Sequence, residues 1–267
     1  MKKKSFSQIL VISLIIGVFT LTGCGSTPPV ANPSSSTPPV VPKVLKVGSD
    51  IAYAPFEFMD ATMKPVGFDI DLMDAIAKDM GYTTKYETSG FDGLPLTLSS
   101  GKYDAAISAM TITPKRAESV LFSDPYFLAN QYIAVKKDSS IKSVKDLKGK
   151  RVGVQNTTTG QDAVVALGIN PKKYDSTPDA LTDLVNGSLD AVVADSPVVL
   201  YFIKEKPSAN IVAIQGDFPK EYYGIAMKLD NKDLATKLNA SLKTIISNGK
   251  YDVIYKKWFN AEAPKLN

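Results

Sequence analysis

Short apolar runs alternate with helical patterns along most of the chain, and this alternation constrains the fold more than any other feature. Alternating strands and helices are typical of α/β proteins with a mainly parallel sheet. The pattern runs through 44–48, 70–80, 103–110 and 116–122, and it restarts at 151–155, 161–167, 181–185 and 189–194. The sequence therefore predicts two successive α/β units.

Polar residues follow each of the predicted strands. In open α/β sheets, ligands bind beyond the carboxyl ends of the strands, so these residues are the first candidates for a site. Asp50 follows the first strand, Thr111 the run at 103–110, and Asp195 the run at 189–194. The strand at 151–155 ends in Gln155, before a polar segment that contains Thr158 and Thr159. We expect these side chains to meet.

The N-terminal residues have the features of an export signal. Three lysines at 2–4 precede an apolar run of 13 residues at 9–21, shorter than the roughly 20 residues of a membrane-spanning helix. Leu21-Thr22-Gly23-Cys24 looks like a bacterial lipobox, and residues 25–42 are rich in Pro, Ser and Thr, a composition that does not bury a core. We expect a signal peptide at 1–23, a lipidated Cys24 and a tether at 24–42. The protein is then extracytoplasmic and anchored to the cell membrane by lipid.

Charge and composition exclude several classes of function. The formal net charge of +4 falls to +1 when Lys2, Lys3 and Lys4 leave with the signal, and the remaining basic residues are scattered among acids, which argues against nucleic-acid binding. With no histidine and one cysteine, a zinc site is not expected. Asp69, Asp71 and Asp74 lack the glycine and closing glutamate of a calcium loop and more simply charge the first turns of a helix. No metal and no cofactor are predicted.

Five motifs resemble those of the bacterial extracellular solute-binding proteins for polar amino acids, and the glutamine-binding members look closest. The resemblance covers 44–259, and its carriers are Asp50 to Phe58, Gly67 to Leu72, Thr111 to Arg116, Phe122 to Tyr126, and Gly249 to Phe259. It implies a two-lobed periplasmic-binding-protein-like fold of type II, in which each lobe is a mainly parallel sheet flanked by helices. Residues 43–128 and 222–267 would form lobe 1 and residues 129–221 lobe 2, with hinge crossings near 126–130 and 219–223.

The resemblance also assigns groups to the two charged ends of an amino acid. The planar guanidinium of Arg116 can hold an α-carboxylate through two parallel hydrogen bonds, which lysine cannot copy. The N–H of Thr111 and the helix start at Thr158 and Thr159 would assist. The carboxylate of Asp195, the hydroxyl of Thr111 and a carbonyl near Ala109 would hold the α-ammonium group. Capping of a helix near residue 197 is the alternative for Asp195, and capping is an equally good explanation of the two threonines.

The rest of the ligand would be held by aromatic and polar side chains. Tyr53 and Phe91 match an aromatic pair that sandwiches the aliphatic stem, although either could be ordinary core. Asp50 and Gln155 would recognise the side chain, and Ser108 is a weaker candidate nearby. The glutamine-binding relatives carry Lys in place of Gln155 and His in place of Ala194. The acid and amide could therefore receive glutamine or pair with the cationic end of arginine or lysine.

The function predicted from these features is capture of a polar L-amino acid, with glutamine or arginine favoured, and its delivery to a permease of the ABC type by lobe closure. The protein is expected to act as a monomer. One alternative is an enzyme on the same fold, such as a cyclohexadienyl (arogenate/prephenate) dehydratase, in which Glu57 or Glu221 could act as the acid. A second alternative is a ligand-sensing ectodomain that works with a separate partner.

Overall fold

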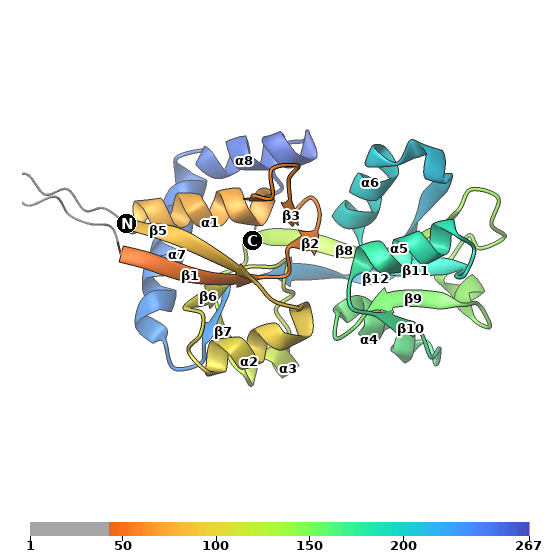
Figure 1. Ribbon diagram of the computed structural model, residues 1–267, viewed down its shortest axis with the longest axis horizontal. Helices are drawn as coiled ribbons and strands as arrows, with labels where there is room; N and C mark the ends of the chain where they lie inside the picture. Colours follow the sequence, from red (N-terminus) through yellow and green to blue (C-terminus); the bar gives the residue numbers. More distant parts are fainter. Residues whose placement is uncertain (1–42, 267) are drawn as a thin grey trace, which may run out of the picture. The chain divides into compact units, whose positions relative to one another are not determined.

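The computed structural model describes residues 43–266. The predicted signal peptide, Cys24 and tether lie outside the described residues. Two five-stranded sheets, each with its own helices, form the two lobes (Figure 1). Among residues 43–266, no helix is both long enough and apolar enough to cross a membrane.

Lobe 1 is built on a sheet of order β5-β1-β6-β13-β7. Four of its strands run in one direction, because β1 pairs in parallel with β5 and β6 whereas β13 is antiparallel to both β6 and β7. Its strands are β1 (Lys43–Ser49), β5 (Tyr82–Thr88), β6 (Ala105–Ala106), β7 (Val120–Phe122) and β13 (Ala226–Lys228), and a small sheet adds β2 (Ala52–Tyr53), β3 (Glu57–Met59) and β4 (Pro65–Val66). Its helices are α1 (Phe68–Asp79), α2 (Leu94–Ser99), α3 (Pro114–Ala117), α7 (Lys232–Ser247) and α8 (Lys250–Phe259).

Lobe 2 repeats this plan in the order β10-β9-β11-β8-β12, and here β8 is the strand that runs against the others. Its strands are β8 (Phe127–Lys136), β9 (Val152–Gln155), β10 (Lys172–Tyr174), β11 (Ala191–Asp195) and β12 (Ile211–Tyr223), and its helices are α4 (Thr159–Ala166), α5 (Thr177–Val185) and α6 (Ser196–Glu205). Three short 3₁₀ turns complete the two lobes at Phe91–Gly93, Val144–Leu147 and Pro207–Ala209. The predicted α/β fold with two mainly parallel sheets is confirmed.

Both sheets are buried on both faces, which explains the continuous apolar runs of the sequence. Successive strand side chains point to opposite faces. In β11, Ala191 and Val193 pack on the side of α4, whereas Val192 and Ala194 pack on the side of α5 and α6. In lobe 1, α1, α7 and α8 cover one face and α2 covers the other (Figure 1). Each sheet therefore holds its strand ends rigidly.

The strands β8 and β12 run side by side and link the two lobes (Figure 1). Their antiparallel pairing joins Phe127 to Tyr223 and Asn130 to Lys220 before a register shift, and it resumes between Tyr132 and Gln215. The start of β8 and the end of β12 fall within the segments 126–130 and 219–223 that were expected to cross between the lobes.

Candidate functional site

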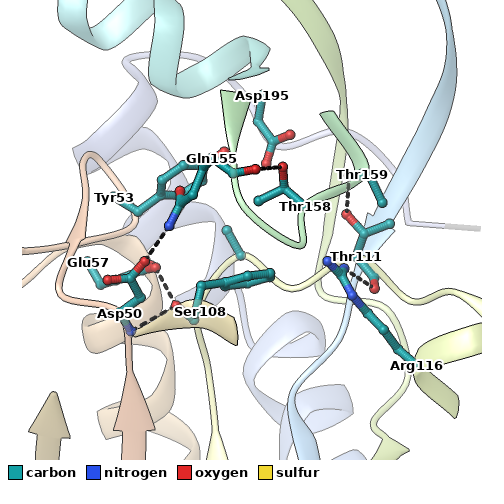
Figure 2. A pocket seen from close by; sticks show the side chains of 12 residues that line it. Asp50, Tyr53, Glu57, Ser108, Thr111, Arg116, Gln155, Thr158, Thr159 and Asp195 are labelled. Atoms are coloured by element: carbon teal, nitrogen blue, oxygen red, sulfur yellow. Dashed lines mark hydrogen bonds between the residues drawn. The ribbon is translucent and has the colours of Figure 1, made fainter. Parts of the chain in front are cut away.

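A small cavity lies between the carboxyl ends of the strands of the two lobes, where ligands bind in open α/β sheets. All eleven residues predicted for the site line it, together with Glu57 (Figure 2). They are Asp50, Tyr53, Phe91, Ser108, Ala109, Thr111 and Arg116 from lobe 1, and Gln155, Thr158, Thr159 and Asp195 from lobe 2. The topology thus brings together residues that are up to 145 positions apart in the sequence.

Arg116 lies on the short helix α3, which begins with Thr113 as its N-cap. The guanidinium donates from Nη1 to the Thr111 carbonyl at 2.8 Å and from Nη2 to the Thr157 carbonyl at 3.0 Å, one from each lobe. It also stacks over the Phe91 ring, 5.0 Å from the centroid. Burial lowers the pKa of Arg116, and the charges of Asp195 and Glu221 act in the opposite direction. A guanidinium has five N–H donors, so three remain free of these two bonds.

Asp195 occupies the N-cap position of α6, yet its side chain caps nothing in the described chain. Its carboxylate instead accepts hydrogen bonds from the Gln131 amide and the Tyr223 hydroxyl. Burial, and then the charge of Glu221, raise the pKa of Asp195 to about 6. The capping alternative is therefore wrong, and the buried carboxylate is available to a positively charged group.

Glu221 belongs to the long strand β12, and from the sequence it was a candidate only for the acid of the alternative enzyme. Its carboxylate accepts from the hydroxyls of Thr111 at 2.6 Å and Thr159 at 2.7 Å, and from the Gln131 amide at 3.1 Å. Because both hydroxyl protons point to Glu221, the two threonine oxygens face other groups as acceptors. Two acids, Asp195 and Glu221, thus sit beside one cation, Arg116.

Thr158 and Thr159 have different roles at the start of α4. Thr158 is the N-cap, and its hydroxyl accepts from the Gln161 N–H and donates to the Gln155 carbonyl at 2.7 Å. Thr159 begins the helix, where the first N–H groups have no partner within the helix. The capping explanation therefore holds for the Thr158 side chain, while the Thr159 side chain faces Glu221.

The other end of the cavity is formed by Asp50 and Gln155, which follow the first strands of the two lobes (Figure 2). The Gln155 amide nitrogen donates to Asp50 Oδ2 at 2.7 Å and to the Asp175 carbonyl at 3.1 Å, and its oxygen accepts from the Thr177 hydroxyl at 2.9 Å. Burial, opposed by the Gln155 bond and assisted by the charge of Asp92, raises the pKa of Asp50 to about 6. All the hydrogen-bonding positions of the Gln155 nitrogen and one oxygen lone pair are thus taken by the protein.

Tyr53 and Phe91 line the cavity between these two ends. Tyr53 is 8% exposed and packs into the core of lobe 1, with its ring 6.3 Å from that of Phe56. Phe91 is half-buried in the 3₁₀ turn before α2 and supports the Arg116 guanidinium. Tyr53 therefore belongs both to the core of lobe 1 and to the lining of the cavity, so core packing and ligand contact are compatible explanations for it.

Sequence reasoning missed Gln131 and the role of Glu221. Gln131 is 1% exposed in the middle of the apolar strand β8, and a polar residue inside such a run is a signal of a buried polar contact. Glu221 had no comparable signal, because its place follows from the pairing of β12 with β8.

Comparison with known proteins agrees with this geometry. The family described as bacterial extracellular solute-binding proteins, family 3, matches residues 45–261. A probable histidine-binding protein of Neisseria gonorrhoeae is 34% identical over 264 residues, 95% of this chain and 96% of that protein.

Solved structures give the same result. The arginine-, lysine-, histidine-binding protein ArtJ of the thermophilic bacterium Geobacillus stearothermophilus is 45% identical with a TM-score of 0.80, over 84% of this chain and 98% of that one. An ancestral arginine-binding protein bound to arginine is 44% identical with a TM-score of 0.78, over 81% of this chain and 98% of that one. These relatives are binding proteins rather than enzymes. The chain therefore belongs to the bacterial extracellular solute-binding proteins, family 3.

Proposed function

We propose that this solute-binding protein captures L-arginine between its lobes and delivers it unchanged to a permease of the ABC type. The observation that carries the choice of ligand is the Asp50 carboxylate at the side-chain end of the cavity, with the Gln155 nitrogen turned toward it at 2.7 Å. Because Gln155 is held by Asp50, Asp175 and Thr177, Asp50 is the group that remains to meet the ligand. A carboxylate is an acceptor and pairs best with a guanidinium or ammonium group.

The other end of the cavity suits the two charged groups that every free amino acid carries. Arg116, with free N–H donors, would hold the α-carboxylate, and the N–H of Thr159 would assist at the helix start. Asp195 would hold the α-ammonium, with the oxygen of Thr111 and the carbonyl of Ala109. These roles rest on the hydrogen bonds of the side chains and on their shared cavity.

The charge of the site favours a cationic amino acid over glutamine. When ionised, Asp50 and Asp195 bring two negative charges to the cavity and Glu221 a third nearby, against the one positive charge of Arg116, and burial raises the pKa of Asp50 and Asp195. Arginine brings one net positive charge and glutamine none, so arginine neutralises more of the buried charge. The binding of arginine by ArtJ and by the ancestral protein supports the same choice.

The hinge provides the capture step. We place the lobe boundaries at residues 128/129 and 221/222, inside the paired segment of β8 and β12. A ligand that contacts both lobes shifts an open and closed equilibrium by its differential affinity for the closed form. The closed form, with both lobes in fixed relative positions, is the surface that a permease would recognise.

We further propose that the chain is exported by a signal at 1–23 and held at the membrane as a monomer by lipid on Cys24 and a tether at 24–42. Because a single acyl chain gives only weak membrane binding, a stable anchor at Cys24 needs more than one chain. Labelling of cells with palmitate should mark the wild-type protein and not Cys24→Ser, which should be released into the soluble fraction. Label on the variant would contradict this assignment.

Titration calorimetry of the soluble region with L-arginine, L-lysine, L-histidine and L-glutamine tests the proposed ligand. Arginine should bind most tightly, and Asp50→Asn should weaken arginine by about a hundredfold while changing glutamine by less than about tenfold, because only a cation loses a charged partner. Asp138→Asn, an exposed acid of lobe 2, is the matched control. Tighter binding of glutamine than of arginine by the wild type would contradict the proposal.

A further inference from the structure

Two carboxyl groups at the cavity are fully buried. Glu57, which lines the cavity, and Asp69, in the predicted first turn of α1, are each 0% exposed. Glu57 Oε1 accepts from the Ser108 hydroxyl at 2.8 Å, and Asp69 Oδ2 accepts from the Ala109 N–H and the Tyr126 hydroxyl, both at 2.8 Å. The proposed capture of arginine gives neither acid a role.

The second oxygen of each carboxyl, Glu57 Oε2 and Asp69 Oδ1, is buried without a hydrogen-bond partner among the described residues. The two side chains lie close together, because Glu57 accepts from Ser108 and Asp69 from the adjacent Ala109, and the charge of Asp69 raises the pKa of Glu57. The groups that face the pair are Asp50, Ser108, Tyr126 and the Ala109 N–H, with Tyr53 also near Glu57, and none of these is a cation. Two adjacent buried anions without a cation are unfavourable, and one proton placed between the two free oxygens satisfies both.

We propose that Glu57 and Asp69 share a single proton and that this acid pair is the positioning device that fixes the main chain of the arginine site. The proposal deepens the proposed function, because the groups that it positions are those assigned to the ligand. The hydrogen-bond pattern places the proton on Glu57 Oε2, since Asp69 already accepts two bonds as an anion and Glu57 accepts one. Burial and the charge of Asp69 raise the pKa of Glu57 well above its usual value, whereas the pKa of Asp69 is raised to about 6.

The pair reaches both ends of the cavity through two short chains of contacts. On one side, Glu57 holds the Ser108 hydroxyl, which accepts from the Asp50 N–H at 3.0 Å (Figure 2). On the other side, Asp69 holds the N–H of Ala109, whose φ of 44° lies in the left-handed region that a residue with a side chain rarely adopts. Asp69 thereby stabilises the turn at Ala109, a residue that lines the cavity.

Infrared spectroscopy tests the shared proton without any ligand. At pH 8, Asp50, Asp69 and Asp195, whose pKa values are about 6, are ionised, so the only expected carbonyl band of a protonated carboxylic acid is that of Glu57. The band should be present in the wild type, shift on deuteration, and vanish in Glu57→Gln. It should persist in Glu205→Gln, which replaces an exposed glutamate of α6. A wild-type spectrum without the band at pH 8 would overturn the proposal.

Arginine affinity tests the positioning role. Glu57→Met, which keeps the length of the side chain but has no donor or acceptor for Asp69 and Ser108, should weaken binding about tenfold or more. Glu57→Gln should recover most of this loss, because its amide can donate to Asp69 and accept from Ser108. Equal affinities of the Met and Gln variants would overturn the positioning role. If Glu57→Met does not fold, the infrared band of the wild type and its loss in Glu57→Gln still test whether the pair shares a proton.

The two proposals fail in different ways. Failure of the wild type to bind arginine would remove the proposed function and leave the infrared test of the shared proton unaffected. Absence of the protonated band together with tight arginine binding would remove the acid pair and leave the function intact.

Discussion

Arg116 donates one hydrogen bond to each lobe and still has three N–H groups free. Only a planar guanidinium can serve two carbonyls and a carboxylate from one position, because its donors point in fixed and different directions. The Phe91 ring beneath it restricts the group further. The residue therefore acts both as a bridge between the lobes and as the proposed carboxylate anchor.

Replacement of Arg116 by lysine should therefore be costly although the charge is kept. We expect Arg116→Lys to weaken arginine binding by about 2 to 3 kcal/mol, the value of charge-assisted hydrogen bonds that are lost. Calorimetry gives the comparison, and Lys115→Ala, an exposed neighbour on α3, serves as the control. An affinity of Arg116→Lys within twofold of the wild type would show that the ligand does not use the paired N–H donors of the guanidinium.

The raised pKa values of Asp50 and Asp195, both about 6, predict how the affinity for arginine depends on pH. A cationic group binds the ionised carboxylate, so binding releases protons and the affinity falls as the pH falls through 6. Each carboxyl should contribute about tenfold between pH 7 and pH 5. Titrations across this range should show a steeper decline for the wild type than for Asp50→Asn, and an affinity that rises toward pH 5 would contradict the assignment.

The site residues that could be predicted from sequence are those that directly follow an apolar strand, such as Asp50, Gln155 and Asp195. Their location depends on the strand alone. The partners of these residues could not be predicted in the same way, because Glu221 and Asp195 are brought together by the pairing of β12, β8 and β11. The burial of Asp69 could not be predicted, because a buried acid and an exposed acid look alike at the first turn of a helix.

Among the elements, β8 and β12 determine how the lobes meet. Gln131 on β8 donates to Glu221 on β12, and Glu221 joins Thr111 of lobe 1 to Thr159 of lobe 2, whose hydroxyl oxygens lie 3.5 Å apart. These bonds exist only when the lobes are close together. Glu221 should therefore stabilise the closed form as well as attract the ligand ammonium.

Glu221→Gln should loosen this closure. The amide has one acceptor oxygen in place of two, and its NH₂ group would face the Gln131 amide donor. We expect the release rate of arginine to rise about tenfold with little change in the association rate. Stopped-flow fluorescence measures both rates, and Asp217→Asn, an exposed acid on the same strand, is the control. An unchanged release rate in Glu221→Gln would show that the bonds do not hold the closed form.

Among the elements, helices and long strands could be predicted from their hydrophobic patterns. The predicted helix at 70–80 is α1, and the strand at 151–155 is β9. The expected strand at 103–110 is reduced to β6 (Ala105–Ala106), because the chain turns at Ala109 to enter the cavity. The small sheet of β2, β3 and β4 has strands of two or three residues, too short for any periodicity to be recognised.

For the whole molecule, buried acids connect ligand binding to stability. Asp50, Asp69 and Asp195 have pKa values of about 6 in the fold, above the values near 4 of an unfolded chain. The folded state therefore binds more protons than the unfolded state between about pH 4 and pH 6. Stability contributed by these groups is present at low pH and lost as the pH rises through 6.

The ligand-free protein should thus be more stable at pH 5 than at pH 7, by on the order of 1 kcal/mol for each fully buried carboxyl whose pKa is near 6, because only the interval from pH 5 to pH 6 contributes. Exposed acids with lowered pKa values, such as Asp60 and Asp146, act in the opposite direction but are screened by solvent. Urea denaturation at the two pH values measures the difference, which Asp195→Asn should reduce. Arginine at a hundred times its dissociation constant should add about 2.7 kcal/mol at pH 7. A ligand-free protein whose stability rises from pH 5 to pH 7 would contradict this account.

A crystal structure of residues 43–267 with L-arginine would show the contacts of the ligand. We expect one arginine molecule between the lobes, with its carboxylate on Arg116, its ammonium group on Asp195 and its guanidinium on Asp50, each within hydrogen-bond distance. An arginine bound in the reverse direction, or bound without contact to Arg116 and Asp195, would contradict it.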